Sequence, residues 1–226
     1  VKLNWGMRRM HVVITGGAGF LGQKLARKLL LGARLTGPDG QKHEVTKLTL
    51  FDVASPAADI VQDKRVKVVT GDIGDRATVD GVVADAAASV FHLAAVVSAG
   101  AEADFDLGMR VNLDGTRHVL EACRRLPKPP HVVFTSSVAV YGGDMPAVIK
   151  DDTPMTPQTS YGAQKAMGEF MINDMSRKGF IDGRALRLPT IVVRPGKPNK
   201  AASTWASSII REPLQGDSVE CPVEPS

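Results

Sequence analysis

The sequence predicts an α/β fold built on a doubly wound parallel sheet with helices on both faces. Short apolar runs alternate along the chain with longer segments of helical periodicity, the pattern of repeated strand–helix–strand units. The runs are apolar throughout rather than alternating, as expected for strands buried on both faces. Crossovers in such sheets are right-handed, which favours the doubly wound arrangement.

Each element follows from this pattern in chain order. We expect strands at residues 10–15, 47–51, 66–70, 89–93, 131–135 and 184–188, and helices at 20–31, 77–87, 109–125 and 161–178. Residues 31–45 hold Gly37, Pro38 and Gly40, which predict a loop inserted between the first helix and the second strand. Beyond Pro195 we expect a helix at 201–211 and then irregular chain. The division predicts a first domain at 1–195 and the start of a second, incomplete one at 196–226.

Composition excludes several classes of function. The two cysteines, Cys123 and Cys221, fit neither a zinc site nor a disulfide framework. The longest apolar runs are too short for a transmembrane helix, and residues 1–10 lack the apolar core of a signal peptide, so we expect a cytoplasmic protein without a membrane partner. The net charge of +4 comes from scattered basic residues, and aromatic residues make up only 5%, which argues against nucleic-acid binding.

A glycine-rich turn joins the first strand to the first helix. Gly16, Gly19 and Gly22 follow the spacing in which one glycine makes a tight turn, the next admits a diphosphate, and the third lets helix pack on strand. The helix N-terminus then offers free N–H groups and partial positive charge to the phosphates. A Rossmann fold with a dinucleotide is therefore predicted, and a glycine turn without a ligand is the alternative.

Asp52 ends the second expected strand, where an acidic residue accepts hydrogen bonds from the adenosine ribose. Its charge would repel a 2′-phosphate, so NAD is favoured over NADP. The alternative is an ordinary turn residue at a strand end.

Tyr161 and Lys165 lie four residues apart at the start of a predicted helix, hence on one face. A phenol acting as a base at neutral pH needs a pKa well below its ordinary value near 10. A lysine cation and an oxidised nicotinamide would stabilise the phenolate. Ser137 ends the fifth expected strand, and ligands in doubly wound sheets bind at the carboxyl ends of strands. The three side chains are expected to converge as the catalytic group.

Taken together, these motifs resemble the extended short-chain dehydrogenase/reductases, the NAD-dependent epimerase/dehydratase family. The matching segments stand in the family's order over roughly residues 10–196, namely 15–22, Asp52, 71–73, 92–95, Asn112, 136–142 and 161–165. The resemblance implies that Asp72 and Ile73 flank the adenine and that Ala94 and Ala95 line the cofactor. It further implies cofactor contacts for Phe20, Leu21, Leu93, Asn112, Tyr161, Lys165, Pro189 and Ile191.

Departures from the family pattern narrow the subgroup. Val138 and Ala139 stand where dehydratases of the family carry Asp-Glu, so the acid–base pair for eliminating water is missing. The segment Leu188-Pro189-Thr190-Ile191 stands where sugar-nucleotide epimerases usually show an aromatic–Asn pair, which argues against a nucleotide-sugar substrate. Residues 193–203 and 209–214 resemble the D-erythronate dehydrogenase subgroup, which implies a small sugar acid as substrate.

The expected activity is therefore oxidation of a secondary hydroxyl by NAD, with Tyr161 as base. The candidate substrate contacts are Ser98, Ser137, Tyr161, Arg194 and Asn199. The resemblance also implies a homodimer, the usual assembly in this family. An epimerase that uses tightly bound NAD as a shuttle is one alternative. A non-catalytic NAD-binding sensor is the other.

Overall fold

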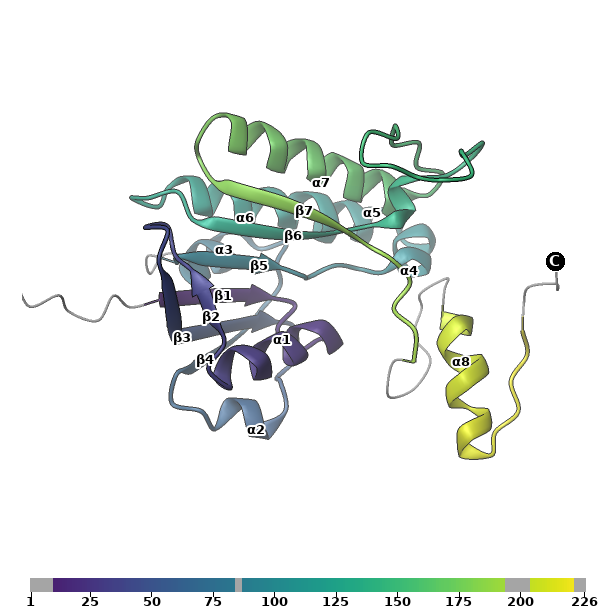
Figure 1. Ribbon diagram of the computed structural model, residues 1–226, viewed down its shortest axis with the longest axis horizontal. Coiled ribbons are helices and arrows are strands. Elements are labelled where there is room, and N and C mark those ends of the chain that lie inside the picture. Colours follow the sequence, from purple (N-terminus) through teal and green to yellow (C-terminus); the bar gives the residue numbers. More distant parts are fainter. Residues whose placement is uncertain (1–9, 84–86, 194–203, 222–226) are drawn as a thin grey trace, which may run out of the picture.

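The computed structural model describes residues 10–83, 87–193 and 204–221, and its centre is a seven-stranded sheet (Figure 1). The strands are β1 (Met10–Thr15), β2 (Arg34–Thr36), β3 (Lys42–Asp52), β4 (Val66–Thr70), β5 (Ser89–His92), β6 (His131–Ser137) and β7 (Asp182–Leu188). Six of them run parallel in the order β4-β3-β1-β5-β6-β7, and β2 pairs antiparallel with the beginning of β3. The predicted doubly wound parallel sheet is confirmed.

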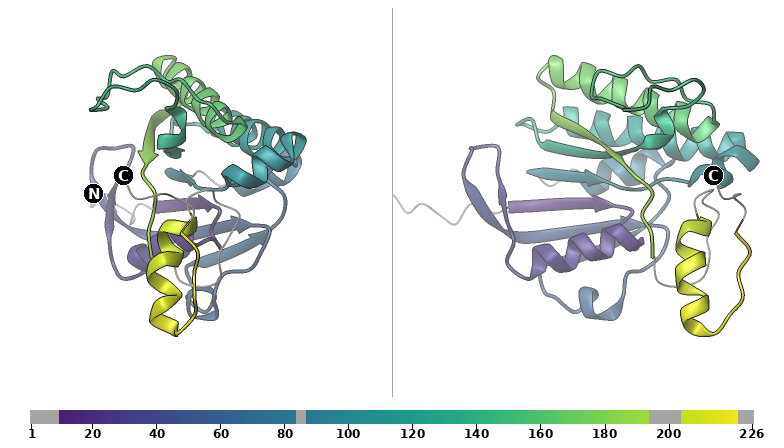
Figure 2. Two further views of the ribbon diagram at one scale, coloured as in Figure 1. Left: turned by 90° about the vertical axis from the view of Figure 1, so that its right-hand side faces the viewer. Right: turned by 45° about the vertical axis from the view of Figure 1, so that its right-hand side comes forward.

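Helices cover the sheet on two faces (Figures 1 and 2). The α1 (Phe20–Leu30) and α2 (Ala58–Val61) helices pack beside β1, β3 and β4. The opposite layer contains α3 (Arg76–Val83), α4 (Ser98–Ala103), α5 (Phe105–Gly108), the π-helix η1 (Met109–Asp114), α6 (Gly115–Arg124) and α7 (Ser160–Arg177). A 3₁₀ turn, η2 (Val138–Val140), follows β6 directly.

Strand β1 shows why the apolar runs are continuous. Val12 and Ile14 point into the core under α1, whereas Val13 points into the core under α3 and α6. All three side chains are fully buried, so both faces of this central strand require apolar residues.

Several segments differ from the strands and helices expected from the sequence. Residues 31–45 form a β-hairpin rather than a loop, because β3 begins at Lys42 and pairs with β2. The helix expected over 109–125 is interrupted by η1, where the Gly115 N–H donates to the carbonyl of Arg110. Helices α2 and α4 were not expected, and the third helix is described only as far as Val83.

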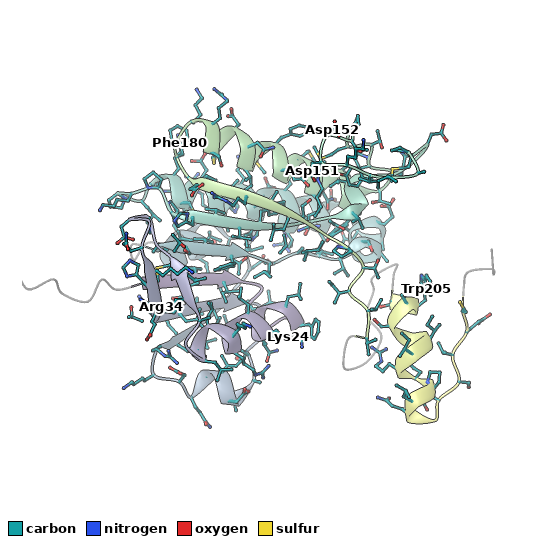
Figure 3. The ribbon with its side chains drawn as sticks, in the orientation of Figure 1. Lys24, Arg34, Asp151, Asp152, Phe180 and Trp205 are labelled. Carbon is teal, nitrogen blue, oxygen red and sulfur yellow. The ribbon has the colours of Figure 1, made fainter. Side chains whose placement is uncertain are left out.

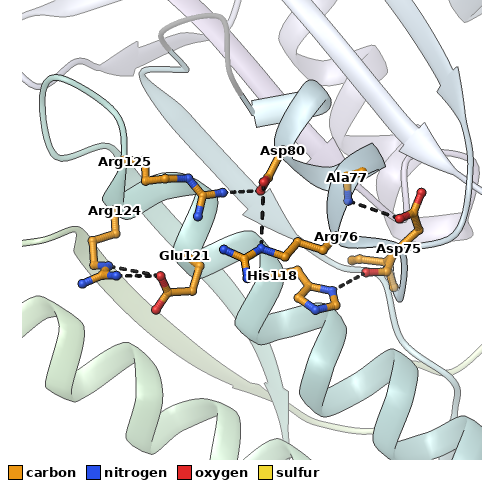
Figure 4. Close-up of polar contacts among 9 residues, drawn as sticks. Asp75, Arg76, Ala77, Asp80, His118, Glu121, Arg124 and Arg125 are labelled. Atoms are coloured by element: carbon orange, nitrogen blue, oxygen red, sulfur yellow. Dashed lines mark hydrogen bonds and ion pairs between the residues drawn. The ribbon is translucent and has the colours of Figure 1, made fainter.

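Polar contacts tie α3 to α6 on the outer surface (Figure 4). Asp80 accepts from Arg125, with Arg76 3.9 Å away, and Glu121 pairs with Arg124 along α6. These groups are largely exposed, so each pair contributes about 1 kcal/mol at most.

Beyond the carboxyl ends of the strands lie α8 (Trp205–Arg211) and η4 (Pro213–Gln215), apart from the sheet, with Trp205 at the start of α8 (Figure 3). Among the described residues, no helix combines the length and apolar character needed to cross a bilayer.

Candidate active site

A pocket of about 560 Å³ opens at the carboxyl ends of the parallel strands. The glycine turn after β1 forms one side and the loop after β5 the next. The end of β6, the start of α7 and the chain after β7 complete it. Predicted residues lining it are Gly16, Gly19, Phe20, Leu21, Gly22, Leu93, Ala95, Ser98, Ser137, Tyr161, Lys165, Pro189 and Ile191. A pocket of similar volume at the opposite end of the sheet, around Pro38 and Pro127, contains none of the candidate catalytic residues.

The glycine turn is shaped by close packing of backbone. Gly16 has a φ of +71°, and a Cβ there would lie 2.7 Å from the Ala94 nitrogen. At Gly22 a Cβ would lie 2.2 Å from the carbonyl oxygen of Gly16. These two positions must be glycine for the fold itself.

Gly19 differs, because a Cβ there would meet only the Gly16 oxygen, at 3.2 Å. Its φ of −70° suits any residue, and it begins α1 without a side-chain cap. The first turn of α1 thus presents backbone to the pocket where a diphosphate fits.

Asp52 lies at the end of β3 beside this turn, where its Oδ2 accepts from the Ala18 N–H at 2.9 Å. The carboxylate therefore holds the glycine turn and stands where an adenosine ribose would approach. Glycine turn, uncapped helix start and strand-end carboxylate together fit NAD.

Asp52→Asn is expected to weaken the discrimination against NADP, because the amide keeps an acceptor for Ala18 but loses the charge that repels a 2′-phosphate. The ratio of NADPH to NADH affinity, measured by cofactor fluorescence, should rise at least ~10-fold, about 1.4 kcal/mol. An unchanged ratio would remove Asp52 from the ribose site.

Three further predicted cofactor residues are not among those that line the pocket. Asp72 accepts from Gly74 N–H and pairs with Arg110, which lowers the pKa of its carboxyl. The Ile73 side chain is buried in the core against Gly115. Ala94 stacks its backbone against Gly16. Contact between any of them and a cofactor stays a prediction.

Asn112 on η1 is likewise not among the residues that line the pocket, and it is only 2% exposed. Its Oδ1 accepts from the Val96 N–H at 2.8 Å, and its Nδ2 donates to the Val96 carbonyl at 3.0 Å and to Gln164 Oε1 at 2.7 Å. Asn112 thereby fixes the loop after β5 that lines the pocket. Sequence reasoning assigned it to the cofactor, and the structure places its amide on backbone and on the catalytic helix.

Ser137, Tyr161 and Lys165 come together at one corner of the pocket. Ser137 ends β6, where its Oγ accepts from the Ala139 N–H at 3.1 Å. Its hydroxyl lies near enough to the Tyr161 phenol to lower the pKa of that phenol. Lys165 Nζ lies 5.6 Å from the centre of the Tyr161 ring. One face of α7 thus carries phenol and ammonium to the end of β6.

The start of α7 is held by two acceptors that the sequence did not reveal. Thr159 Oγ1 accepts from the Gly162 N–H at 3.1 Å, and Glu102 Oε2 accepts from the Ser160 N–H at 2.9 Å. The threonine is a regular N-cap, whereas Glu102 arrives from α4 and has no sequence signature.

The electrostatics of this corner differ from expectation. Burial raises the pKa of the Tyr161 phenol above its ordinary value, and the hydrogen bond with Ser137 only partly offsets this. Lys165 is 3% exposed, burial lowers its pKa to about 7, and its Nζ donates to the Thr135 carbonyl at 2.7 Å. The chain alone thus raises the phenol pKa, and its lowering by a lysine cation together with an oxidised nicotinamide stays a prediction.

Lys165 is expected to make stability depend on pH. Between pH 7 and about 10 the unfolded lysine is charged while the folded one has lost its proton, so the unfolded state binds more protons and stability rises with pH. The unfolding free energy of the wild-type protein should therefore rise, relative to that of Lys165→Met, by up to ~1.4 kcal/mol per pH unit in this range. Denaturant titrations at pH 7, 8 and 9 measure it, and a flat difference would contradict the depressed pKa.

A buried ion pair lies directly beneath the catalytic corner. Glu169, 3% exposed on α7, accepts from Arg187 Nε at 3.0 Å and Nη2 at 2.8 Å, and from the Ser136 hydroxyl. Arg187 also donates to the Tyr141 oxygen after η2. The cluster ties α7, β6 and β7 together, and its partners are too far apart in sequence to predict.

Some predicted substrate contacts cannot be placed. Arg194 and Asn199 lie outside the described residues. Ser98 lines the pocket at the start of α4, together with Val138, Ala139, Thr159 and Thr190, which sequence reasoning had not assigned to it. In the described part of the chain, no group of three or more potential metal ligands occurs.

Comparison with known proteins decides the family. The model of the NAD dependent epimerase/dehydratase family matches residues 12–223. The chain belongs to this family. The predicted family is thereby confirmed, and NAD is its cofactor.

Two relatives that match nearly the whole chain are both D-erythronate dehydrogenases. The chain is 60% identical to D-erythronate dehydrogenase of Cupriavidus necator over 96% of its length, and 48% identical to that of Haemophilus influenzae over 95%. It spans 66% and 65% of those two proteins, respectively.

Solved structures agree with the fold. A nucleoside-diphosphate-sugar epimerase from Agrobacterium tumefaciens matches with a TM-score of 0.85 and 44% identity, over 96% of this chain and 63% of that one. A Thermus thermophilus UDP-glucose 4-epimerase in complex with NAD matches with a TM-score of 0.74 and 26% identity, over 93% and 64%.

Proposed function

We propose that the chain carries the NAD-binding and catalytic part of a dehydrogenase that oxidises a secondary hydroxyl of a small sugar acid. The observation that carries this is the meeting of Ser137, Tyr161 and Lys165 beside a pocket whose other end fits a dinucleotide. The 60% identity with a D-erythronate dehydrogenase supports a D-erythronate-like substrate, converted to the 2-oxo acid.

Each catalytic side chain has a role set by its surroundings. Tyr161, as phenolate, accepts the proton of the substrate hydroxyl, and Ser137 donates a hydrogen bond to the same oxygen as it becomes a carbonyl. NAD, when bound, supplies the acceptor for the hydride. Lys165 adds positive charge next to the phenol and can donate to the cofactor ribose. Burial favours the neutral phenol and neutral amine, so charge brought by the cofactor is needed to form the phenolate.

Substrate selection is proposed to come from Val138 and Ala139, small neutral residues that line the pocket together with Tyr161, and from Arg194 and Asn199. Val138 and Ala139 line the pocket and offer no carboxylate for eliminating water. Ser98 contributes a hydroxyl. In sequence these groups fall in the proposed first domain, residues 1–195, and at the start of the proposed second, residues 196–226.

A panel of four-carbon sugar acids tests the function, with NAD or NADP and with absorbance of the reduced cofactor as readout. Net reduction of NAD with D-erythronate or a close stereoisomer supports the proposal. No reduction with any member of the panel overturns it.

One alternative has a specific observation behind it, the 44% identity with the nucleoside-diphosphate-sugar epimerase structure. Turnover of a UDP-sugar without net formation of NADH would favour an epimerase activity. NAD binding with no turnover of any alcohol or sugar nucleotide would favour a sensor.

We also propose that the protein assembles as a homodimer through its long helices. Phe105 on α5 and Phe170 on α7 are 57% and 62% exposed, which leaves large apolar side chains on that layer. Sedimentation of the protein and of Phe170→Glu tests this, since a charge in the interface should shift a dimer towards monomer.

A further inference from the structure

His92 is a buried histidine to which the catalytic scheme gives no role. It ends β5 with 1% exposure, and its ring packs at a tilt against Phe134, with centroids 5.6 Å apart. Its Nδ1 lies 2.7 Å from Thr15 Oγ1 at the end of β1, and its Nε2 lies 2.9 Å from Thr116 Oγ1 on α6. One ring therefore bridges three elements.

The hydrogen positions along this bridge follow from counting donors. Thr116 has one hydroxyl hydrogen and donates it to the Asn112 carbonyl at 2.6 Å, so towards His92 it can only accept. Nε2 must then carry the ring proton, and Nδ1 must accept the hydroxyl hydrogen of Thr15. Thr15 in turn accepts from the Ala94 N–H at 3.3 Å.

The result is a chain of hydrogen bonds with a single direction, from Ala94 N–H through Thr15, His92 and Thr116 to the Asn112 carbonyl. This direction requires a neutral imidazole ring. Burial lowers the pKa of His92 to about 3, and the nearby Lys165 charge acts in the same direction. The ring therefore keeps one tautomer across the ordinary pH range.

Both ends of this chain lie next to residues that line the cofactor pocket. At the first end, the Ala94 backbone is the surface against which Gly16 packs. At the other end, Asn112 lies in the π-helical turn, and its side chain holds both backbone polar groups of Val96 and the amide of Gln164. Gln164 is next to Lys165 on α7. The bridge thus spans from the glycine turn to the catalytic helix.

We propose that His92 is a positioning residue for the cofactor site, which fixes the glycine turn relative to the π-helical turn that holds Val96 and α7. This rests on the NAD site of the proposed function but not on its substrate. Binding of NAD and the state of the ring are therefore the readouts, and they stay meaningful if the sugar-acid activity fails.

The first experiment is ¹⁵N NMR of the histidine rings, with the His92 signals assigned by comparison with His92→Phe. We expect an Nε2–H tautomer whose shifts do not change between pH 5 and 9. An Nδ1–H tautomer, or a ring that titrates in this range, would overturn the bond directions on which the proposal depends.

The second experiment separates positioning from stability. His92→Phe keeps ring packing but leaves the Thr15 hydroxyl without its acceptor and the Thr116 hydroxyl without its donor, so it should lower both stability and NADH affinity. The triple variant Thr15→Val, His92→Phe, Thr116→Val makes the bridge apolar, which should recover part of the stability, since it removes the incompletely paired hydroxyls but also their bonds to the Ala94 N–H and the Asn112 carbonyl. We expect the triple variant to bind NADH at least ~10-fold more weakly than the wild-type protein does, because a displacement of about 1 Å in a site has an effect of this size or larger. Full recovery of NADH affinity in the triple variant would reduce His92 to a core residue.

His11 offers a matched control. It is buried on β1 and lies 2.9 Å from Thr49 Oγ1, a histidine–threonine contact like that of His92 but at the strand end away from the pocket. His11→Phe should cost stability and leave NADH affinity unchanged. If both histidine variants weaken NADH binding equally, the effect is general loosening of the sheet and the proposal is wrong.

Discussion

Replacing Tyr161 with phenylalanine is expected to lower kcat for sugar-acid oxidation by ~10²- to 10⁴-fold, the usual contribution of a positioned general base. The change removes one oxygen, the proposed proton acceptor, whose pKa is influenced by the neighbouring Ser137. The ring, its packing and the two acceptors at the start of α7 remain, so NADH affinity and stability should change little.

Tyr141 provides the matched control, because the sequence contains only two tyrosines. The Tyr141 oxygen accepts from Arg187 beneath the site, so Tyr141→Phe should cost far less activity. Ser137→Ala is expected to fall between the two, since it removes a hydrogen bond to the reacting oxygen but no proton acceptor. A Tyr161→Phe protein that oxidises its best substrate at the wild-type rate would exclude the phenol as base.

The catalytic corner was predictable because it depends on local geometry. Tyr161 and Lys165 share a helix face by their spacing, and Ser137 reaches them because strand ends in a parallel sheet meet at one edge. The same holds for the central strands, whose burial on both faces leaves a continuous apolar run that is easy to recognise.

What escaped prediction depends on tertiary structure. The π-helical turn at Asn112 has the same apolar periodicity as the helix around it, so the sequence of 109–125 indicates one helix. The β-hairpin in residues 31–45 carries the glycine and proline residues of a loop, and they form its turn. The lowered phenol pKa was expected from charges alone, whereas burial of Tyr161 and Lys165 acts in the opposite direction.

Two glycine-to-alanine changes only three residues apart are expected to fail in different ways. Gly22→Ala places a methyl carbon 2.2 Å from the Gly16 oxygen and 2.9 Å from the Gly17 Cα, both backbone atoms that cannot move without moving the turn. We expect a loss of ~3 kcal/mol or more in unfolding free energy, at the upper end of overpacking effects.

Gly19→Ala should leave the fold nearly intact and remove the cofactor. Its backbone angles suit alanine, and the new methyl needs only a shift of a few tenths of an ångström at the Gly16 oxygen. Alanine at a helix N-cap costs up to ~1 kcal/mol relative to glycine. The methyl group nevertheless enters the pocket above the first turn of α1, so NADH affinity should fall by ~10-fold or more, about 1.4 kcal/mol.

Gly81→Ala completes the series, because this glycine lies within α3 with open space around its Cα. Alanine there should raise stability by ~0.5–1 kcal/mol and leave NADH binding unchanged. Denaturant unfolding and NADH fluorescence on all three variants separate the two jobs of the turn. If Gly19→Ala binds NADH as well as Gly81→Ala does, the first turn of α1 is not where the diphosphate binds. The glycine spacing would then serve packing alone, as Gly16 and Gly22 already do.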